Sequence, residues 1–303
     1  NRFEHGYGLS PEIVDVALDY DPDLIITVDN GISSICGVEY ARKNGVKVLI
    51  TDHHLPAKEL PNADVIINPQ LANDKFPSKN LAGVGVIFYI LLALRAKLKQ
   101  EYWFENNNID YPNLANFLDL VALGTIADLV PLDKNNRTMV AHGLKLIKNN
   151  KSKPGIYALL NLAGRQLSKL TSSDLSFAVA PRLNAAGRLT DMSLGIECLL
   201  TDDEVDAIKI AGKLNRLNIE RRKIQDNMQE EALAELEKYL QDTSGEIPYG
   251  ICIYDKDWHQ GVVGILASKI KEKFNRPVIV FAKENEGVLK GSARSISGLH
   301  IKD

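Results

Sequence analysis

The chain has few of the residues that mark disulfide-bonded, zinc-binding or membrane-embedded proteins. Only three of its 303 residues are cysteines, and Cys36, Cys198 and Cys252 do not have the close spacing of a zinc-binding pair. This scarcity indicates a reducing compartment. The longest uncharged apolar run, 81–94, is too short to span a bilayer, and no basic-then-apolar leader opens the chain. We therefore expect a cytoplasmic protein that does not act at a membrane.

An excess of positive charge is also missing. Lys and Arg number 36 against 39 Asp and Glu, so the formal net charge is −3. This balance argues against a general electrostatic attraction to nucleic acid but is compatible with a local basic groove. The length, together with a hydrophobic content of 45%, is sufficient for two globular domains with real cores.

The first part of the sequence has the pattern of a parallel α/β domain. Ser10 followed by Pro11 is typical of a helix start, and Asn44-Gly45 is typical of a helix end. Continuous apolar runs predict strands, and the first of these we expect to be buried on both faces. The expected elements are a helix from Pro11 to about Tyr20, strands at 24–28, 46–51 and 63–69, and a helix from about Ser34 to Lys43. This order predicts a right-handed βαβ unit.

The rest of the sequence is mostly helical and then returns to an α/β pattern. Helical spacing dominates from about 84 to 200. Residues 203–241 contain no proline and one glycine, and they predict a long helix or a pair of helices bridging two domains. A second α/β region follows, with expected strands at 249–255, 276–282 and 289–295 and a helix at 261–274.

Polar side chains follow two neighbouring strands at the point where each strand ends. Asp29 follows the run at 24–28, and Asp52, His53 and His54 follow the next strand. Side chains at the carboxyl edge of a parallel sheet converge on the crevice where open α/β folds bind ligands. Each motif alone could be a plain turn or a polar cap. Together they favour a divalent metal site, because oxygen and nitrogen ligands suit Mn²⁺ and related ions.

Other polar residues stand in apolar or small-residue surroundings. Asp128 lies within the apolar stretch "LGTIADLVPL". If its carboxylate is buried, it needs a cation or hydrogen bonds as partners. The alternative is that it forms a hydrogen bond at the end of a helix. Arg182, Asn184 and Arg188 lie among small residues that allow a phosphate to approach, and arginine binds phosphate with two hydrogen bonds. A salt-bridged helix start is the alternative there. Weaker candidates close to glycines are His259, Ser292 and Arg294.

The ordered series "ITVDNGISS", "ITDHHLP", "FPSKNLAGVGV", "LDLVALGTIADLVPLD", "APRLNAAGRL", "WHQGVVGILASKIKE" and "LKGSARSISGLH" resembles the DHH phosphoesterase superfamily. Within it, the series is similar to the RecJ-like family of single-strand-specific 5′-to-3′ DNA exonucleases. The resemblance covers essentially the whole chain. It implies an α/β fold with a parallel-sheet DHH domain at 1–200 that carries a large helical insert. A connecting helix at 201–242 and the start of a smaller, DHHA1-like substrate-binding domain at 243–303 would follow.

The resemblance also implies the chemistry of a site that holds two Mn²⁺ or Mg²⁺ ions. Metal ligands would be Asp29, His53 and Asp128, while Asp52 would orient its neighbouring histidine and His54 would act at the scissile phosphate. Single-stranded DNA would be bound by Arg182, Asn184, Arg188 and His259, and its 5′ end by Arg2, Ser292 and Arg294. The implied role is DNA repair and recombination, with single-strand-binding protein and a helicase as candidate partners.

The family pattern extends beyond this sequence. The chain begins at Asn1 without methionine, and an Asp-x-Asp-Gly loop with further metal carboxylates is expected upstream. A Gly-Gly-His segment and an OB-like domain are expected downstream of Asp303. We therefore expect residues 1–303 alone to bind Mn²⁺ weakly and to have little nuclease activity. Two alternatives stay open: another phosphodiesterase or pyrophosphatase of the superfamily, and a non-catalytic DNA-binding relative, which should have lost Asp29, His53 or Asp128.

Overall fold

The structure, a computed structural model, describes residues 8–242, 247–299 and 301. Arg2 therefore lies outside the described residues. The chain forms two compact units, one of Asn1–Pro181 and Ile196–Ala211 and the other of Arg182–Gly195 and Gly212–Asp303. The domain limits expected at residues 200 and 242 stay predictions, whereas packing places the segment 182–195 with the second unit. In the described ranges, no helix has the length and apolar character that crossing a bilayer requires.

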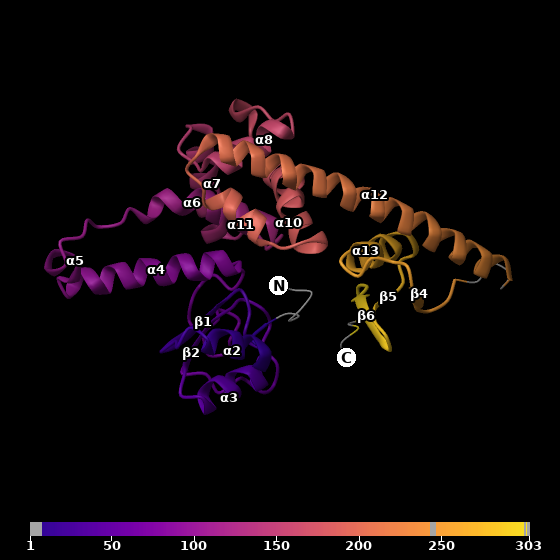
Figure 1. The fold of residues 1–303 in the computed structure, drawn as a ribbon, viewed down its shortest axis with the longest axis horizontal. Helices are drawn as coiled ribbons and strands as arrows, with labels where there is room; N and C mark the ends of the chain where they lie inside the picture. Colours follow the sequence, from indigo (N-terminus) through magenta and orange to yellow (C-terminus); the bar gives the residue numbers. More distant parts are fainter. Residues whose placement is uncertain (1–7, 243–246, 300, 302–303) are drawn as a thin grey trace. The chain divides into compact units, whose positions relative to one another are not determined.

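The first unit contains a small parallel sheet (Figure 1). Its strands are β1 (Leu24–Val28), β2 (Lys47–Thr51) and β3 (Val65–Ile67), in the order β1-β2-β3. Two helices precede and separate the first strands: α2 (Pro11–Leu18) and α3 (Ile35–Lys43). Helix α2 begins where expected, because the Ser10 hydroxyl oxygen accepts a hydrogen bond from the Ile13 N–H. The expected βαβ unit is confirmed.

The expectation that β1 is buried on both faces is wrong. Leu24, Ile26 and Val28 are 44%, 51% and 45% exposed. The opposite face, which carries Ile25, packs on the apolar core beneath α2 and α3. The alternating burial along β1 shows that, in the described part of the chain, only one of its faces is covered. An apolar run predicts a strand, but it does not reveal which neighbours will cover that strand.

The helical character expected from 84 to 200 is confirmed. The helices in order are α4 (Gly83–Gln100), α5 (Trp103–Asn106), η1 (Leu114–Phe117), α6 (Leu118–Ala127), α7 (Lys134–Lys148), α8 (Pro154–Leu162), η2 (Leu167–Lys169), α9 (Ser172–Asp174), η3, a π-helix (Leu175–Val179), α10 (Ala180–Leu189) and α11 (Ser193–Leu200). Helices α6 and α7 pack closely, because Gly143 has no side chain: a Cβ there would lie 2.1 Å from the Leu118 carbonyl oxygen. The packing of α7 against α6 therefore holds α6 in place, and Asp128 directly follows the last residue of α6.

The second unit is built on the long helix α12 (Glu204–Asp242), a single helix of 39 residues that belongs to this unit from Gly212 onward. The expected second α/β region is confirmed as β4 (Ile251–Asp255), α13 (Val263–Phe274), β5 (Val278–Asn285) and β6 (Val288–Arg294). Strand β5 pairs in parallel with β4 and antiparallel with β6. Met228, Ala232 and Leu236 of α12 share one apolar core with α13 and this sheet.

Candidate metal centre and phosphate-binding residues

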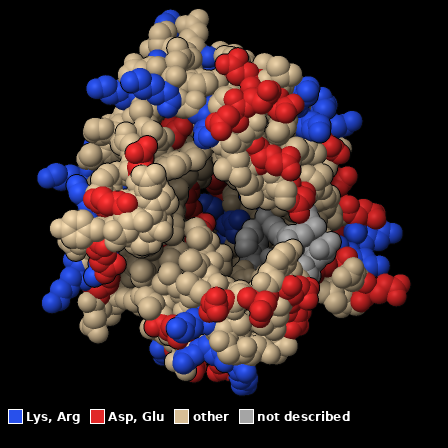
Figure 2. All heavy atoms as spheres, turned by 60° about the vertical axis from the view of Figure 1, so that its left-hand side comes forward, with Lys and Arg blue, Asp and Glu red and all other residues tan. Residues whose placement is uncertain are grey.

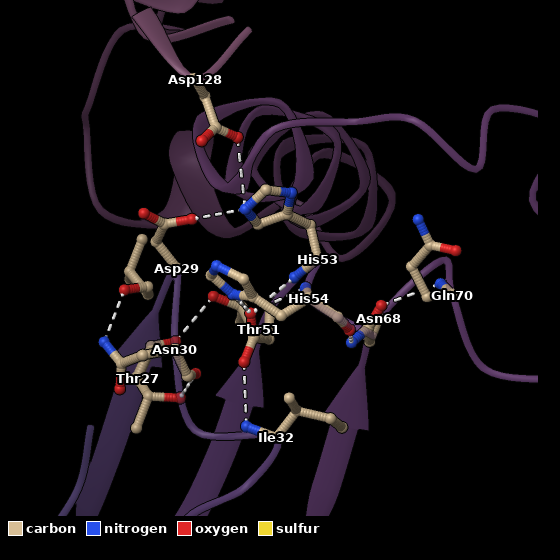
Figure 3. Close-up of polar contacts among 12 residues, drawn as sticks. Thr27, Asp29, Asn30, Ile32, Thr51, His53, His54, Asn68, Gln70 and Asp128 are labelled. Carbon is tan, nitrogen blue, oxygen red and sulfur yellow. Dashed lines mark hydrogen bonds and ion pairs between the residues drawn. The ribbon is translucent and has the colours of Figure 1, made fainter. Parts of the chain in front are cut away.

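Three polar segments leave the first sheet at one edge (Figure 3). Asp29 follows β1, the triplet Asp52-His53-His54 follows β2, and Asn68 follows β3. Because all three strands run in parallel, these residues lie on the same side of the sheet. The sequence pattern therefore places carboxylate, imidazole and amide groups together at the end where parallel sheets bind ligands.

Asp29 is held in an uncommon backbone conformation. Its φ angle is +65°, in the left-handed region, and its N–H donates to the Thr51 carbonyl oxygen at 3.0 Å. The Thr27 hydroxyl supports the turn by donating to the Asn30 carbonyl oxygen at 2.7 Å. The Asp29 carboxylate lies against Gly83, the first residue of α4, where a Cβ would come within 2.2 Å of Asp29 Oδ1. A negative charge is favourable at this end of a helix.

The His53 ring lies between two carboxylates from different parts of the first unit (Figure 3). Its Nε2 is 3.0 Å from Asp29 Oδ1 and 3.4 Å from Asp128 Oδ2. Nevertheless, this buried Nε2 forms no well-aligned hydrogen bond. The contact with Asp29 raises the pKa of His53 against the effect of burial, and the charge of Asp128 adds to the rise. Oxygen and nitrogen atoms that approach closely without aligning on one another fit a divalent cation between them.

Asp128 enters this group from the end of α6. It is the residue that caps the carboxyl end of that helix, and its side chain is 42% exposed, so the carboxylate is not fully buried. Partial burial raises the pKa of Asp128, while the charge of His53 acts in the opposite direction. His54 is also near, since single ligand atoms of Asp29, His53 and His54 lie within 4.8 Å of one another.

Asp52 is the buried centre of a hydrogen-bond network. Its side chain is 1% exposed, and Oδ1 accepts from the His53 N–H at 2.7 Å and the His54 N–H at 3.2 Å. The same oxygen lies 2.7 Å from His54 Nδ1, and Oδ2 accepts from the Ile32 N–H at 2.9 Å. Burial favours the neutral acid, but the hydrogen bonds from Ile32 and His54 outweigh it and hold the pKa of Asp52 below its ordinary value. An ionised Asp52 thus fixes the orientation of the His54 ring.

The predicted 5′-end residues Ser292 and Arg294 lie together in the second unit. Arg294 Nη1 donates to Ser292 Oγ at 3.0 Å, and its Nε donates to Ser268 Oγ at 2.8 Å. A Cβ on Gly264, in the first turn of α13, would lie 3.0 Å from Arg294 Nη2. The guanidinium group is therefore held against the start of α13 by two hydroxyl groups.

Four other predicted substrate-binding residues also belong to the second unit. Arg182 Nε donates to Asn215 Oδ1 at 2.9 Å, and Arg188 Nη1 donates to the Gly261 carbonyl oxygen at 3.3 Å. His259 Nδ1 accepts from the Gly261 N–H at 3.0 Å; burial lowers the pKa of His259, and the charge of Glu220 acts in the opposite direction. Asn184 is exposed on α10. Their roles stay predictions.

Sequence reasoning missed several residues that shape these sites. Asn68 is fully buried, and its Nδ2 donates to the His54 carbonyl oxygen at 2.9 Å. Its signal was present, because it follows the third strand as Asp29 follows the first. The sequence shows Gly83 as a glycine at the start of an apolar helix and Ser268 as a hydroxyl residue within α13. Neither pattern indicates a contact with a site residue. Their importance depends on Asp29 and Arg294, which are distant in the sequence.

Comparison with known proteins adds to this geometry. Residues 3–125 match the DHH family, N-terminal domain, and residues 247–303 match the DHHA1 domain. The single-stranded-DNA-specific exonuclease RecJ of Escherichia coli (strain K12) is 57% identical over 303 residues, which is 100% of this chain and 52% of that protein. The chain thus spans about half the length of this curated relative.

Solved structures agree in fold. The crystal structure of an exonuclease RecJ bound to manganese matches with a TM-score of 0.79 and 33% identity, over 99% of this chain and 70% of that one. The structure of RecJ in complex with Mn²⁺ from Thermus thermophilus matches with a TM-score of 0.76 and 33% identity, over 95% and 40% of the two chains. This chain belongs to the RecJ family of DHH proteins.

Proposed function

We propose that this chain is the catalytic part of a metal-dependent exonuclease that hydrolyses phosphodiester bonds in single-stranded DNA from the 5′ end. The observation that carries the proposal is the position of His53 Nε2, which faces the carboxylates of Asp29 and Asp128. The name and activity of the Escherichia coli relative support the choice of substrate.

The carboxylate and imidazole groups of this site suit Mn²⁺ or Mg²⁺. Carboxylate oxygens bind both ions, and imidazole nitrogen also binds Mn²⁺. Asp29, His53 and Asp128 would hold the ion, and solved RecJ structures contain manganese. When bound there, a divalent ion would supply the positive charge that polarises a phosphodiester and activates a water molecule for attack. No sulfur ligand is required, since the group of possible ligand atoms formed by Asp29, His53 and His54 consists of carboxylate oxygen and imidazole nitrogen.

The remaining residues would orient the strand and manage its charge. Asp52 fixes the ring of His54, whose side chain is 57% exposed and thus accessible to a scissile phosphate. There His54 would stabilise the developing charge or transfer a proton. In the second unit, the residues proposed to contact the strand are Arg182, Asn184, Arg188 and His259. The 5′ end would meet Ser292 and Arg294, together with Arg2.

The proposal places the activity in the cytoplasm, in DNA repair and recombination. Single-strand-binding protein and a helicase are the proposed protein partners, and they follow from the family resemblance alone.

Digestion of a 5′-labelled single strand by the full-length protein with Mn²⁺ tests the proposal. We expect labelled mononucleotide to appear from the first time point, little digestion of a blunt duplex, and loss of digestion in His53→Ala. Release of label only after most of the strand has gone would indicate the opposite direction. Equal digestion of duplex and single strand would contradict the substrate class.

A second test concerns the 5′ end itself. Because hydroxyl and guanidinium donors suit a phosphate dianion, Arg294→Ala should slow digestion of 5′-phosphorylated strands more than that of 5′-hydroxyl strands. The comparison is made on two oligonucleotides that differ only in this phosphate. An equal loss on both substrates would mean that Arg294 does not recognise the terminal phosphate.

A further inference from the structure

Arg221, on helix α12 in the second unit, is a half-buried cation held by neutral groups. Its Nη2 donates to Asn218 Oδ1 at 3.0 Å, and its Nη1 donates to Gln225 Oε1 at 2.7 Å. Asn218 is 1% exposed, so this amide is a fixed part of the interior. No carboxylate among the described residues forms a salt bridge with Arg221. The two amides therefore hold the guanidinium in position without neutralising it.

Helix α10 brings a second arginine toward the same region. The hydrogen bond from Arg182 to Asn215 joins α10 to α12. Arg188 lies on the same helix as Arg182, six residues further along, and its Nη1 donates to the Gly261 carbonyl oxygen in the second unit. Burial lowers the pKa of Arg221, the charges of Arg222 and Arg188 lower it further, and Asp226 acts in the opposite direction. Arg188 is therefore close enough to repel Arg221.

The charge of Asp226 only partly offsets this repulsion, since the pKa of Arg221 is still lowered, and a bound anion would relieve it. Like charges in a partly desolvated region repel one another more strongly than they would in water. Arginine stays protonated at neutral pH, so proton loss cannot relieve the repulsion. The Arg221 guanidinium has five N–H groups. One N–H on Nη1 donates to Gln225, and one N–H on Nη2 donates to Asn218. The remaining donors lie in one plane, a geometry that matches two oxygens of a phosphate group.

We propose that Arg221 binds a backbone phosphate of the single strand, beside the phosphate contact assigned to Arg188. This inference rests on the proposed function and adds a binding residue to it. The Asn218 and Gln225 amides orient the guanidinium group before the strand arrives, so little side-chain freedom is lost on binding.

The chain offers a matched control in Arg222, which carries the same charge on the same helix but is exposed. Binding of a fluorescent oligothymidine to the full-length protein is measured by anisotropy in EDTA over a range of KCl concentrations. Each phosphate contact on a single strand contributes about 0.7 to the slope of log K against log salt concentration. We expect Arg221→Gln to reduce the slope by about this amount, and Arg222→Gln to change it by less than half as much.

A third variant separates charge from geometry and guards against misfolding. Arg221→Lys should keep the salt slope, because the charge remains, but weaken binding, because lysine lacks the planar donor pair. Thermal denaturation of all three variants reports whether each is folded. Equal slopes for Arg221→Gln and Arg222→Gln, or unweakened binding by a folded Arg221→Lys, would overturn the inference and leave the proposed function intact. Failure of the unaltered protein to bind the strand would overturn both.

Discussion

At the residue scale, the backbone of Asp29 determines which substitutions can be interpreted. A φ angle of +65° is tolerated by Asp and Asn but costs other side chains about 1–2 kcal/mol. Asp29→Asn should therefore leave the free energy of unfolding within about 0.5 kcal/mol of the unaltered protein, whereas Asp29→Ala should lower it by at least about 1 kcal/mol. Both variants should lose Mn²⁺-dependent digestion, because both lack the carboxylate. Urea denaturation and digestion assays measure the two effects separately.

Asp21 provides the control for this prediction. It has a φ angle of +47° and is exposed, and it takes no part in the metal centre. Asp21→Ala should reduce stability as Asp29→Ala does but leave digestion unchanged. If Asp29→Asn retained full digestion, the assignment of Asp29 as a metal ligand would be wrong.

Gly83 is the residue whose missing side chain makes room for the Asp29 carboxylate. Alanine there would place a Cβ 2.2 Å from Asp29 Oδ1, so the carboxylate would have to move away from His53. We expect Gly83→Ala to weaken Mn²⁺ binding by at least about tenfold, which corresponds to about 1.4 kcal/mol. Isothermal titration with Mn²⁺ measures this directly.

Gly85 is the matched position, two residues further along α4 and also buried. A Cβ there would meet Leu81 Cδ2 at 3.3 Å, Leu81 Cβ at 3.5 Å and Met139 Cε at 3.7 Å, so only the flexible end of Leu81 would have to shift slightly. Gly85→Ala should therefore leave Mn²⁺ binding within about twofold. Equal loss in both variants would point to general damage to α4 and not to displacement of Asp29.

At the element scale, the start of α7 depends on a charged cap. Asp133 Oδ1 accepts from the Asn136 N–H at 3.0 Å, and Oδ2 accepts from the Ser78 hydroxyl at 2.5 Å. Burial acts to raise the pKa of Asp133, but the Ser78 and Asn136 hydrogen bonds outweigh it and hold that pKa below its ordinary value. Because the folded pKa is lowered, the stabilisation is present above the unfolded value of about 4 and is lost as the pH falls through the folded value.

Asp133→Ala should accordingly lower the free energy of unfolding by about 1–2 kcal/mol at pH 7. This deficit should begin to shrink only below about pH 4. Ser10→Ala removes the uncharged cap of α2, so its deficit should not depend on pH. Urea denaturation of both variants between pH 7 and about pH 3.5 provides the comparison, and a constant deficit for Asp133→Ala would show that ionisation of Asp133 is not involved.

The elements that local chemistry determines were predictable from the sequence. Ser10-Pro11 starts α2 and Asn44-Gly45 ends α3 because caps act within a few residues, and the apolar runs gave the strands. The half-exposed state of β1 was not predictable, since burial depends on what packs against a strand. The same limit applies to the sites. Strand-end placement brought Asp29 and His53 together, but the contact of Asp29 with Gly83 depends on packing between segments that are distant in the sequence. The amides that hold Arg221 lie three and four residues away on the same helix, whereas the approach of Arg188 to Arg221 again depends on packing.

At the scale of the whole molecule, charge is dispersed. On the face drawn in Figure 2, Lys and Arg side chains alternate with Asp and Glu, and the net charge of the chain is −3. A protein of this kind cannot rely on a broad positive field to attract a nucleic acid. The proposed binding of single-stranded DNA would then depend on a few placed arginines, and the candidates Arg182, Arg188, Arg221 and Arg294 all belong to the second unit.

The proposed metal ligands and these arginines belong to different units, so removal of metal should separate catalysis from binding. Asp29, His53 and Asp128 are in the first unit. Phosphate contacts through guanidinium groups need no divalent ion, whereas hydrolysis at a carboxylate and imidazole site does. In EDTA, the full-length protein should lose digestion of single-stranded DNA, while its affinity for the same strand in fixed KCl should stay within about twofold. Anisotropy and digestion on one oligonucleotide measure both, and added Mn²⁺ should restore hydrolysis. A loss of affinity in EDTA as large as the loss of digestion would mean that the metal itself holds the strand, and that the arginines of the second unit contribute little to binding.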